Sequence, residues 1–398
     1  MTESSQSINE TALPTSTFAG SDSCLHLKFS RSDRFVRELR RRVDAYFERT
    51  GRRRRDCPQM YFKTATILAW FISSYLLLLF VATSWWAVLP LAVVLGISVA
   101  AIGFNIQHDG AHKAYSDHQW VNKIMALTLD LIGGSSYLWN WKHNTIHHTY
   151  PNIPGQDDDI DIGLLGRLSP HQKRFWFHRL QGLYLWLLYG FLAIKWHLFD
   201  DFFNIAIGRV GTHKVSRPRG ADLLVFIGGK VVFFSLAFVI PMLLHPVWAT
   251  LLVYGIAAFV SGVVLSVVFQ LAHCVGEADF PAPVASPEGG QRMQTEWAVH
   301  QVQTTVDFAR GNRVICWFLG GLNFQIEHHL FSRICHVHYP ALAKVIEETC
   351  REFGVRYTAQ RSFLSALRSH FRWLVEMGRP TRQLRWVTNE YPNPEIAQ

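Results

Sequence analysis

The chain has 398 residues, of which 49% are hydrophobic and only 17% are charged, and its formal net charge is +9. Ordinary soluble domains carry about a quarter charged residues, and disordered or collagen-like chains lack this apolar content. A basic nucleic-acid-binding protein is also excluded, because it would not contain uncharged apolar runs of about 20 residues. Composition therefore indicates a membrane protein with no nucleic-acid partner.

The chain opens with two polar segments. Residues 1–24 are rich in Ser and Thr and predict a disordered tail, and residues 25–60 form a basic segment that contains the run Arg52–Arg55. No early apolar stretch precedes a small-residue cleavage site, so we expect no secretory signal peptide.

Two apolar blocks follow, and each is long enough for two membrane spans. Residues 64–107 contain no charged residue, and residues 223–272 contain only Lys230. The first block is interrupted around Ser84 and the second at Pro246, where proline disfavours helix in the residue before it. At about 1.5 Å per residue, each half crosses a hydrocarbon core of about 30 Å. We predict two helical hairpins with spans near 64–83, 85–106, 223–244 and 247–271.

The basic residues predict the orientation. All of the 39 Lys and Arg residues except Lys230 lie outside the spans, and neither hairpin connection contains one. The positive-inside rule therefore places both termini and the central segment in the cytoplasm. Lys230 lies near the cytoplasmic end of the third span, and we expect its side chain to snorkel toward water.

Eight of the 19 histidines occur in four short motifs, HDGAH, HNTIHH, QLAHC and QIEHH. Residues four apart on a helix share a face, as in the first, second and fourth motifs. The first and third motifs follow spans that run inward, so both are expected at the cytoplasmic membrane boundary, and the other two motifs lie in the cytoplasmic segments. The eight histidines are His108, His112, His143, His147, His148, His273, His328 and His329.

Clustered protonatable groups beside lipid indicate a shared partner, because isolated charges there are unfavourable. The alternative is a chance grouping of surface histidines. Eight imidazoles suit two metal ions better than one structural zinc, which usually includes cysteine ligands. Zinc, copper, iron and nickel all accept imidazole, so the residues alone leave the element open.

The motifs HDGAH, HNTIHH and QIEHHLF resemble the three histidine boxes of the integral-membrane fatty-acid desaturases, and the likeness covers roughly residues 60–345. The Gln that begins the third box resembles the front-end subgroup and related acyl-CoA and acyl-lipid enzymes. The family implies two iron ions held by the eight histidines, with His273 as an additional ligand after the fourth span. Gln325 stands where many relatives have His; it binds the cofactor weakly, through water, or not at all.

The resemblance implies an all-α integral membrane protein with four transmembrane helices in two hairpins. A cytoplasmic helical cap would hold the di-iron site, the desaturase domain would occupy residues 61–345, and residues 346–398 would form a cytoplasmic C-terminal segment. The implied reaction uses O2 to remove two hydrogens from a fatty-acyl-CoA or acyl-lipid chain, which we expect in a dry tunnel. Alternatives are a hydroxylase on the same scaffold and, from another class, a membrane metal transporter or sensor.

The electron supply is expected from outside the chain. The sequence contains neither the His-Pro-Gly-Gly signature of a fused cytochrome domain nor a Gly-rich dinucleotide fingerprint. We therefore expect a separate reductase, ferredoxin or cytochrome to dock on the cytoplasmic face.

Other polar motifs near the boxes have weaker interpretations. The acidic run Asp157–Asp161 is expected to be a solvated loop, or alternatively to hold imidazole N–H groups. Asp109 and Glu327 either support the ligands or are exposed. The segment Cys335–His338 is expected to pack beneath the site, and His300 is a minor ligand candidate.

Overall fold

The structure is a computed structural model, and it describes residues 27–286 and 290–380. The predicted tail, residues 1–24, lies outside the described residues, as does the end of the predicted C-terminal segment. Helices dominate, and the six strands within these ranges have two residues each.

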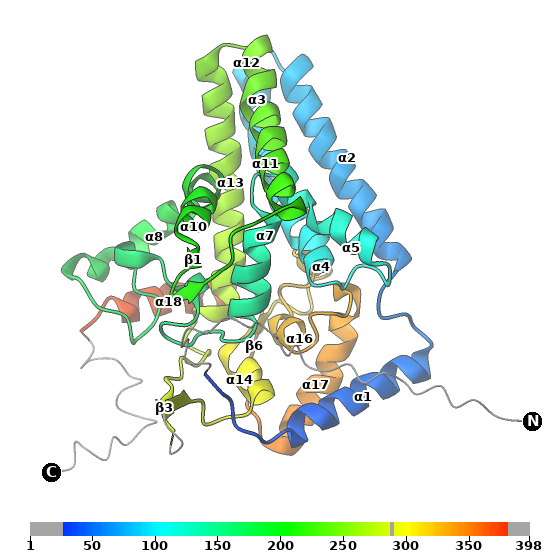
Figure 1. Cartoon of the computed structure of the whole chain (residues 1–398), viewed down its shortest axis with the longest axis vertical. Helices are drawn as coiled ribbons and strands as arrows, with labels where there is room; N and C mark the ends of the chain where they lie inside the picture. Colours follow the sequence, from blue (N-terminus) through cyan, green and yellow to red (C-terminus); the bar gives the residue numbers. More distant parts are fainter. Residues whose placement is uncertain (1–26, 287–289, 381–398) are drawn as a thin grey trace, which may run out of the picture.

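Four apolar helices are long enough to cross a membrane, as predicted, and they stand together at one end of the molecule (Figure 1). They are α2 (Pro58–Phe80); α3 (Trp85–Ile102), continued by η1 (Gly103–Gln107) and α4 (His108–Ala111); α11 (Ala221–Phe234), continued by η7 (Ser235–Val239) and α12 (Ile240–Leu244); and α13 (Val247–His273). The first begins at Pro58, before the predicted position 64, because proline suits the first turn of a helix.

Small residues bring α3 and α13 close together. A Cβ atom built on Gly96 of α3 would lie 2.5 Å from the Ala257 carbonyl oxygen of α13. Small residues at such crossings permit the close backbone approach that supports helix association in membranes. The two helices that end in predicted ligands, His108 and His273, are therefore held side by side.

Lys230 does not snorkel, so that prediction is wrong. Its side chain is buried, and its Nζ atom donates to Asp201 Oδ2 and to the Gly133 carbonyl oxygen, both at 2.7 Å. The carboxylate comes from α10 (Asp201–Ile207), which packs against the span. An ion pair with a further hydrogen bond satisfies the ammonium group without water.

Short elements connect the two hairpins. They are α5 (Gln119–Ala126), α6 (Thr128–Leu131), α7 (Ser136–Trp139), η2 (Asn140–His147), η3 (Asp158–Ile160), η4 (Gly163–Leu165), η5 (Trp176–Leu180), α8 (Gln181–Tyr189), α9 (Leu192–Lys195), η6 (Trp196–Asp200), α10, β1 (Arg209–Val210) and β2 (His213–Lys214). The helical stretches Trp176–Tyr189 and Leu192–Ile207 meet at a bend of 64°, and they would add a fifth candidate span only if counted as one.

The remaining elements lie at the end of the spans where the histidine motifs occur (Figure 1). They are α1 (Arg34–Thr50), β3 (Val284–Ala285), β4 (Gln291–Arg292), α14 (Trp297–Thr304), β5 (Asp307–Phe308), α15 (Arg313–Phe318), α16 (Gln325–Leu330), η8 (His336–His338), α17 (Tyr339–Phe353), β6 (Ala359–Gln360) and α18 (Phe363–Met377). Strands β1–β2 and β3–β4 pair antiparallel, and β5–β6 pair parallel with Asp307 opposite Ala359.

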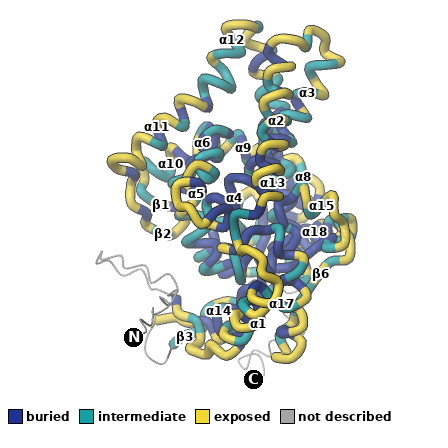
Figure 2. The backbone as a smooth tube through the Cα atoms, turned by 90° about the vertical axis from the view of Figure 1, so that its right-hand side faces the viewer, coloured by how far each residue is buried: buried dark blue, intermediate teal, exposed yellow. Residues whose placement is uncertain are grey.

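Burial is concentrated where these helices meet the spans (Figure 2). The outer ends of the four spans carry exposed apolar side chains such as Phe80, Trp86 and Leu243. Helix α1 buries Phe35, Leu39, Val43 and Phe47 against α17, because these residues recur every four positions and form one stripe.

Candidate metal centre

The eight predicted histidines meet in one place, although they come from four distant parts of the chain. They lie on or directly after α4 and η2, at the end of α13 and on α16, and none of them has more than 8% of its surface accessible. Ring centroids of neighbouring histidines are separated by distances such as 4.4 Å for His108 and His328 and 4.7 Å for His147 and His273.

The imidazoles form overlapping groups in which one ring nitrogen from each residue lies within 4.8 Å of the others. The groups are His108, His112, His143 and His328; His147, His273 and His329; and His148, His328 and His329. The first two groups share no residue, and the third connects them. This arrangement matches two adjacent ligand sets better than one four-ligand site.

The ring nitrogens also pass a test of fit. Seven of the eight histidines have a buried ring nitrogen that lacks a hydrogen-bond partner among the described residues. These atoms are Nε2 of His108, His112, His147, His328 and His329, and Nδ1 of His148 and His273. Buried polar atoms are nearly always satisfied, so a concentration of unpaired imidazole nitrogens indicates a missing partner. Neutral imidazole nitrogens are ligands for iron.

Burial keeps these imidazoles neutral. Burial first, and the neighbouring histidines second, lower the pKa of four rings well below the ordinary value; these are His112, His148, His328 and His329. A neutral ring offers a lone pair, which a protonated ring does not. These four rings are therefore in the ligand-competent form at neutral pH.

The second motif is a π-helix, which the spacing of four did not predict. In η2 the backbone N–H of His148 donates to the His143 carbonyl oxygen at 3.0 Å, five residues back. This wider turn places His148 Nε2 3.2 Å from His143 Nε2, while His147 points toward His273. Three histidines of one motif thereby face the interior, as is frequent for π-helical turns at functional sites.

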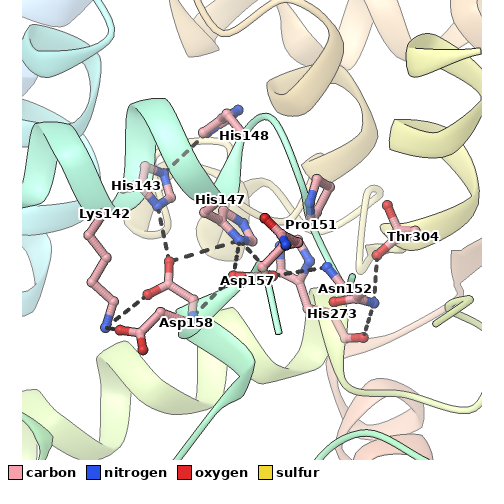
Figure 3. Close-up of polar contacts among 12 residues, drawn as sticks. Lys142, His143, His147, His148, Pro151, Asn152, Asp157, Asp158, His273 and Thr304 are labelled. Atoms are coloured by element: carbon pink, nitrogen blue, oxygen red, sulfur yellow. Dashed lines mark hydrogen bonds and ion pairs between the residues drawn. The ribbon is translucent and has the colours of Figure 1, made fainter. Parts of the chain in front are cut away.

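The acidic loop is buried at Asp157, so the expectation of a solvated loop is wrong there. Both carboxylate oxygens of Asp157 lie 3.1 Å from His147 Nδ1, and they also accept the backbone N–H groups of Asn152 and Asp159 (Figure 3). Burial alone would lower the pKa of His147, but Asp157 and Asp159 outweigh it and raise the pKa. Asp157 therefore orients His147 and leaves Nε2 free, as the alternative interpretation proposed.

Lys142 pairs with two further carboxylates of this loop. Its Nζ atom lies 3.2 Å from a carboxylate oxygen of both Asp158 and Asp159 (Figure 3). Burial would raise the pKa of Asp159, but Lys142 and His143 lower it instead. The ionised Asp159 lies 3.7 Å from His143 Nδ1 and can orient that ring.

Three further side chains contact the histidines, and two of them were missed in the sequence. Gln301 Oε1 lies 2.8 Å from His329 Nδ1, and the Tyr339 hydroxyl lies 3.4 Å from His328 Nδ1. Gln325 donates through Nε2 to His273 Nε2 at 3.0 Å, so it lies within the cluster. Gln301 follows His300 in the sequence, but a glutamine carries no motif that distinguishes it.

The weaker candidates lie outside the cluster. Asp109 and Glu327 are buried, yet Asp109 bonds His336 at 2.9 Å and Glu327 accepts from the Tyr357 hydroxyl at 2.9 Å. Neither has a hydrogen bond to the eight histidines in the part of the chain that the structure describes. His300 bonds the Pro151 carbonyl oxygen at 2.9 Å and belongs to none of the three groups.

A cavity of about 330 Å³ adjoins the cluster. His108, His143 and Gln325 contribute to its wall, and apolar side chains such as Leu265 and Phe269 line much of the rest. An apolar wall excludes water and accepts hydrocarbon.

A second cavity, of about 460 Å³, lies between the spans. The two cavities share four lining residues: Val99, Ile132, His197 and Ser261. The cavity beside the histidines therefore adjoins the cavity within the helix bundle.

Comparison with known families explains this combination of a histidine cluster and an apolar cavity. The sequence profile of the family described as fatty acid desaturase matches residues 83–361, which include all four histidine motifs. The chain belongs to the fatty acid desaturase family. As a desaturase it is an oxidoreductase that acts on fatty-acyl chains in a membrane, as predicted from the boxes.

Curated relatives agree with this assignment. The sn-1 linoleoyl-lipid 6-desaturase of Arthrospira platensis is 40% identical over 350 residues, which are 88% of this chain and 94% of that protein. A Synechocystis protein of the same name is 38% identical over 354 residues, 89% and 98% of the two chains. The acyl-lipid (8-3)-desaturase of Physcomitrium patens is 36% identical over 357 residues, 88% and 72% of the two. These relatives are desaturases, so they give no support to the alternative that the chain is a membrane metal transporter or sensor.

Proposed function

We propose that this desaturase introduces a double bond into the acyl chain of a membrane lipid, with its eight clustered histidines holding two iron ions. The chain would lose two hydrogen atoms while two electrons and two protons are supplied and one O2 is reduced to two waters. Iron held by these histidines would activate O2, which is the oxidant, since no side chain can attack an unactivated methylene. Holding the acyl chain beside the metals and keeping water away from it would be the work of the protein's own side chains.

One observation carries this proposal: the unpaired imidazole nitrogens lie beside an apolar cavity. His108 and His143 belong both to the ligand groups and to the cavity wall. A methylene group in the cavity would therefore lie next to the metals, away from bulk water. The adjoining cavity between the spans would receive the rest of the hydrocarbon.

A lipid-bound substrate is favoured over a coenzyme A thioester. The relatives from Arthrospira platensis and Synechocystis, which match over nearly their whole length, are named for linoleoyl lipids and for position 6. We therefore propose position 6 of a lipid-bound linoleoyl chain as the site of reaction.

The histidine cluster is proposed to face the cytoplasm. The hairpin connections around Ser84 and Pro246 lack Lys and Arg, whereas the segments beside the cluster are basic. Single cysteines introduced at Ser84 and at Arg361 of intact cells test this orientation. A membrane-impermeant maleimide should label the first position only; labelling of the second would contradict it.

The function is tested by expression in a host that supplies linoleoyl lipids, a ferredoxin and its reductase. Mass spectrometry of derivatised lipids should locate a new double bond at position 6, and none in His329→Ala. His300→Gln serves as the matched control, because His300 lies outside the ligand groups, and it should retain the product. A hydroxylated product, or equal activity in His329→Ala, would contradict the proposal.

A further inference from the structure

We propose that the exposed basic face of α1 and Arg52–Arg55 is the docking site of an acidic, soluble one-electron carrier. Electrons would pass from this face to the metal centre along Phe47, His338 and Tyr339. The inference rests on the proposed function and adds where and how the electrons enter.

The charge of this face is concentrated. Residues 34–55 contain ten arginines and three acidic residues. The apolar stripe of α1 is buried against α17, so the arginines lie on the remaining surface; Arg34, Arg40, Arg49 and Arg53 are exposed. None of these four forms an ion pair within residues 27–286 and 290–380.

The position of α1 favours a soluble partner over a lipid surface. Helix α1 crosses the end of the molecule opposite the tips of the four spans (Figure 1). A helix that bound anionic headgroups would be expected beside the spans. Helix α1 instead lies where a protein of opposite charge can reach it, and Arg52–Arg55 continue its basic face toward the beginning of α2 at Pro58.

A series of contacts leads from this face to a predicted ligand. The Arg54 guanidinium lies over the Phe47 ring at 5.0 Å, and the Phe47 and His338 rings meet edge to face at 5.1 Å. His338 precedes Tyr339, whose hydroxyl lies 3.4 Å from His328 Nδ1. The three side chains are buried, so the path is packed protein from the surface to the cluster.

Charge complementarity identifies the occupant. Opposite charges steer a carrier to a surface and raise its association rate, by about 10 to 1,000-fold, without requiring a large interface. Each encounter would oxidise the carrier by one electron and reduce the metal pair by one, so two encounters supply one reaction. A plant-type [2Fe–2S] ferredoxin is an acidic carrier of this kind.

Docking is tested by binding of that ferredoxin to the full-length protein in nanodiscs, with and without metal. The variant R40E/R49E/R53E should weaken affinity at least about tenfold and reduce its dependence on salt. The control variant R361E/R368E/R372E reverses the same number of charges, at three exposed arginines that lie on α18 or just before it. It should retain its affinity for ferredoxin. A basic cytochrome c should not bind the unaltered protein.

The path is tested with Phe47→Leu, which keeps an apolar side chain in the stripe but removes the ring on His338. Carrier affinity and reduction by dithionite should be unchanged, while the carrier-driven reduction rate at saturation should fall several-fold. Equal rates would remove Phe47 from the path.

The outcomes separate this inference from the proposed function. Absence of desaturation with dithionite as well as with ferredoxin would contradict the function itself. If charge reversal leaves ferredoxin affinity unchanged, the docking site is wrong. If hydrogen exchange of α1 instead slows when phosphatidylglycerol replaces phosphatidylcholine, the face binds lipid.

Discussion

The side-chain oxygen of Gln301 lies 2.8 Å from Nδ1 of His329, and Nε2 of the same ring is buried without a partner in the described structure. Gln301 thus holds the ring so that its free nitrogen faces His147 and His273. Loss of such a supporting hydrogen bond typically lowers metal affinity about 10 to 100-fold. We predict this loss for Gln301→Leu, measured by iron competition with a chelator. Gln303→Leu on the same helix should bind iron normally; equal losses would contradict the assigned role.

Because Lys230 and Asp201 form a buried pair, we predict that replacing one of them lowers stability far more than replacing both. Lys230→Met would leave the Asp201 carboxylate buried without its partner, which costs about 3–5 kcal/mol. Lys230→Met/Asp201→Asn should recover most of that stability, because no unpaired charge remains. Thermal unfolding in detergent micelles checks both variants. If Lys230→Met were as stable as the unaltered protein, the lysine would have to reach water, and the buried ion pair would be contradicted.

His370 predicts a loss of stability in acid. Burial lowers its pKa from 6.5 to about 4, although its hydrogen bond to the Cys274 carbonyl oxygen opposes this. The unfolded chain binds this proton below pH 6.5, whereas the folded chain does not until about pH 4. The stabilisation is therefore complete above pH 6.5 and declines toward pH 4, by about 3 kcal/mol.

His370→Gln should flatten the pH dependence of the melting temperature between these two pH values. His118→Gln is the control, because His118 is exposed, and it should leave the dependence as it is. An unchanged slope in His370→Gln would show that other groups cause the acid sensitivity.

The position of Ser261 predicts that this residue limits the length of acyl chain that the enzyme accepts. It is buried on α13 and lines both the cavity beside the histidines and the cavity between the spans. Ser261→Phe would fill the junction, so the enzyme should convert short acyl chains and reject long ones. Lipid analysis of a host with mixed chain lengths measures this preference. Leu252→Phe, an exposed position on the same helix, is the control; an unaltered preference in Ser261→Phe would exclude this path.

The large-scale organisation was predictable because it depends on composition over long windows. Uncharged runs of about 20 residues have few stable arrangements other than membrane helices, and four such helices are present. The histidines were also found from their spacing, since His108 and His112 lie one helical turn apart and share a face. Their convergence follows from the helices that carry them.

The surroundings of the histidines were not predictable in the same way. In the π-helical turn that brings His148 to His143 the hydrogen bond reaches five residues back instead of four, and spacing alone does not reveal it. Lys230 and Asp157 are charged, and single charges are usually solvated; each is buried because a partner from a distant or unexpected position satisfies it. Tertiary contacts decided these cases.

The metal content of the purified protein tests the central claim most directly. Eight converging imidazoles, seven of which have a ring nitrogen without a partner within the described chain, predict about two iron ions per chain. His147→Ala and His329→Ala should each lose iron and all product while still inserting into the membrane, whereas His300→Gln should keep both. Folded protein that contains no iron, and that does not consume O2 with a reductant and lipid, would contradict the account.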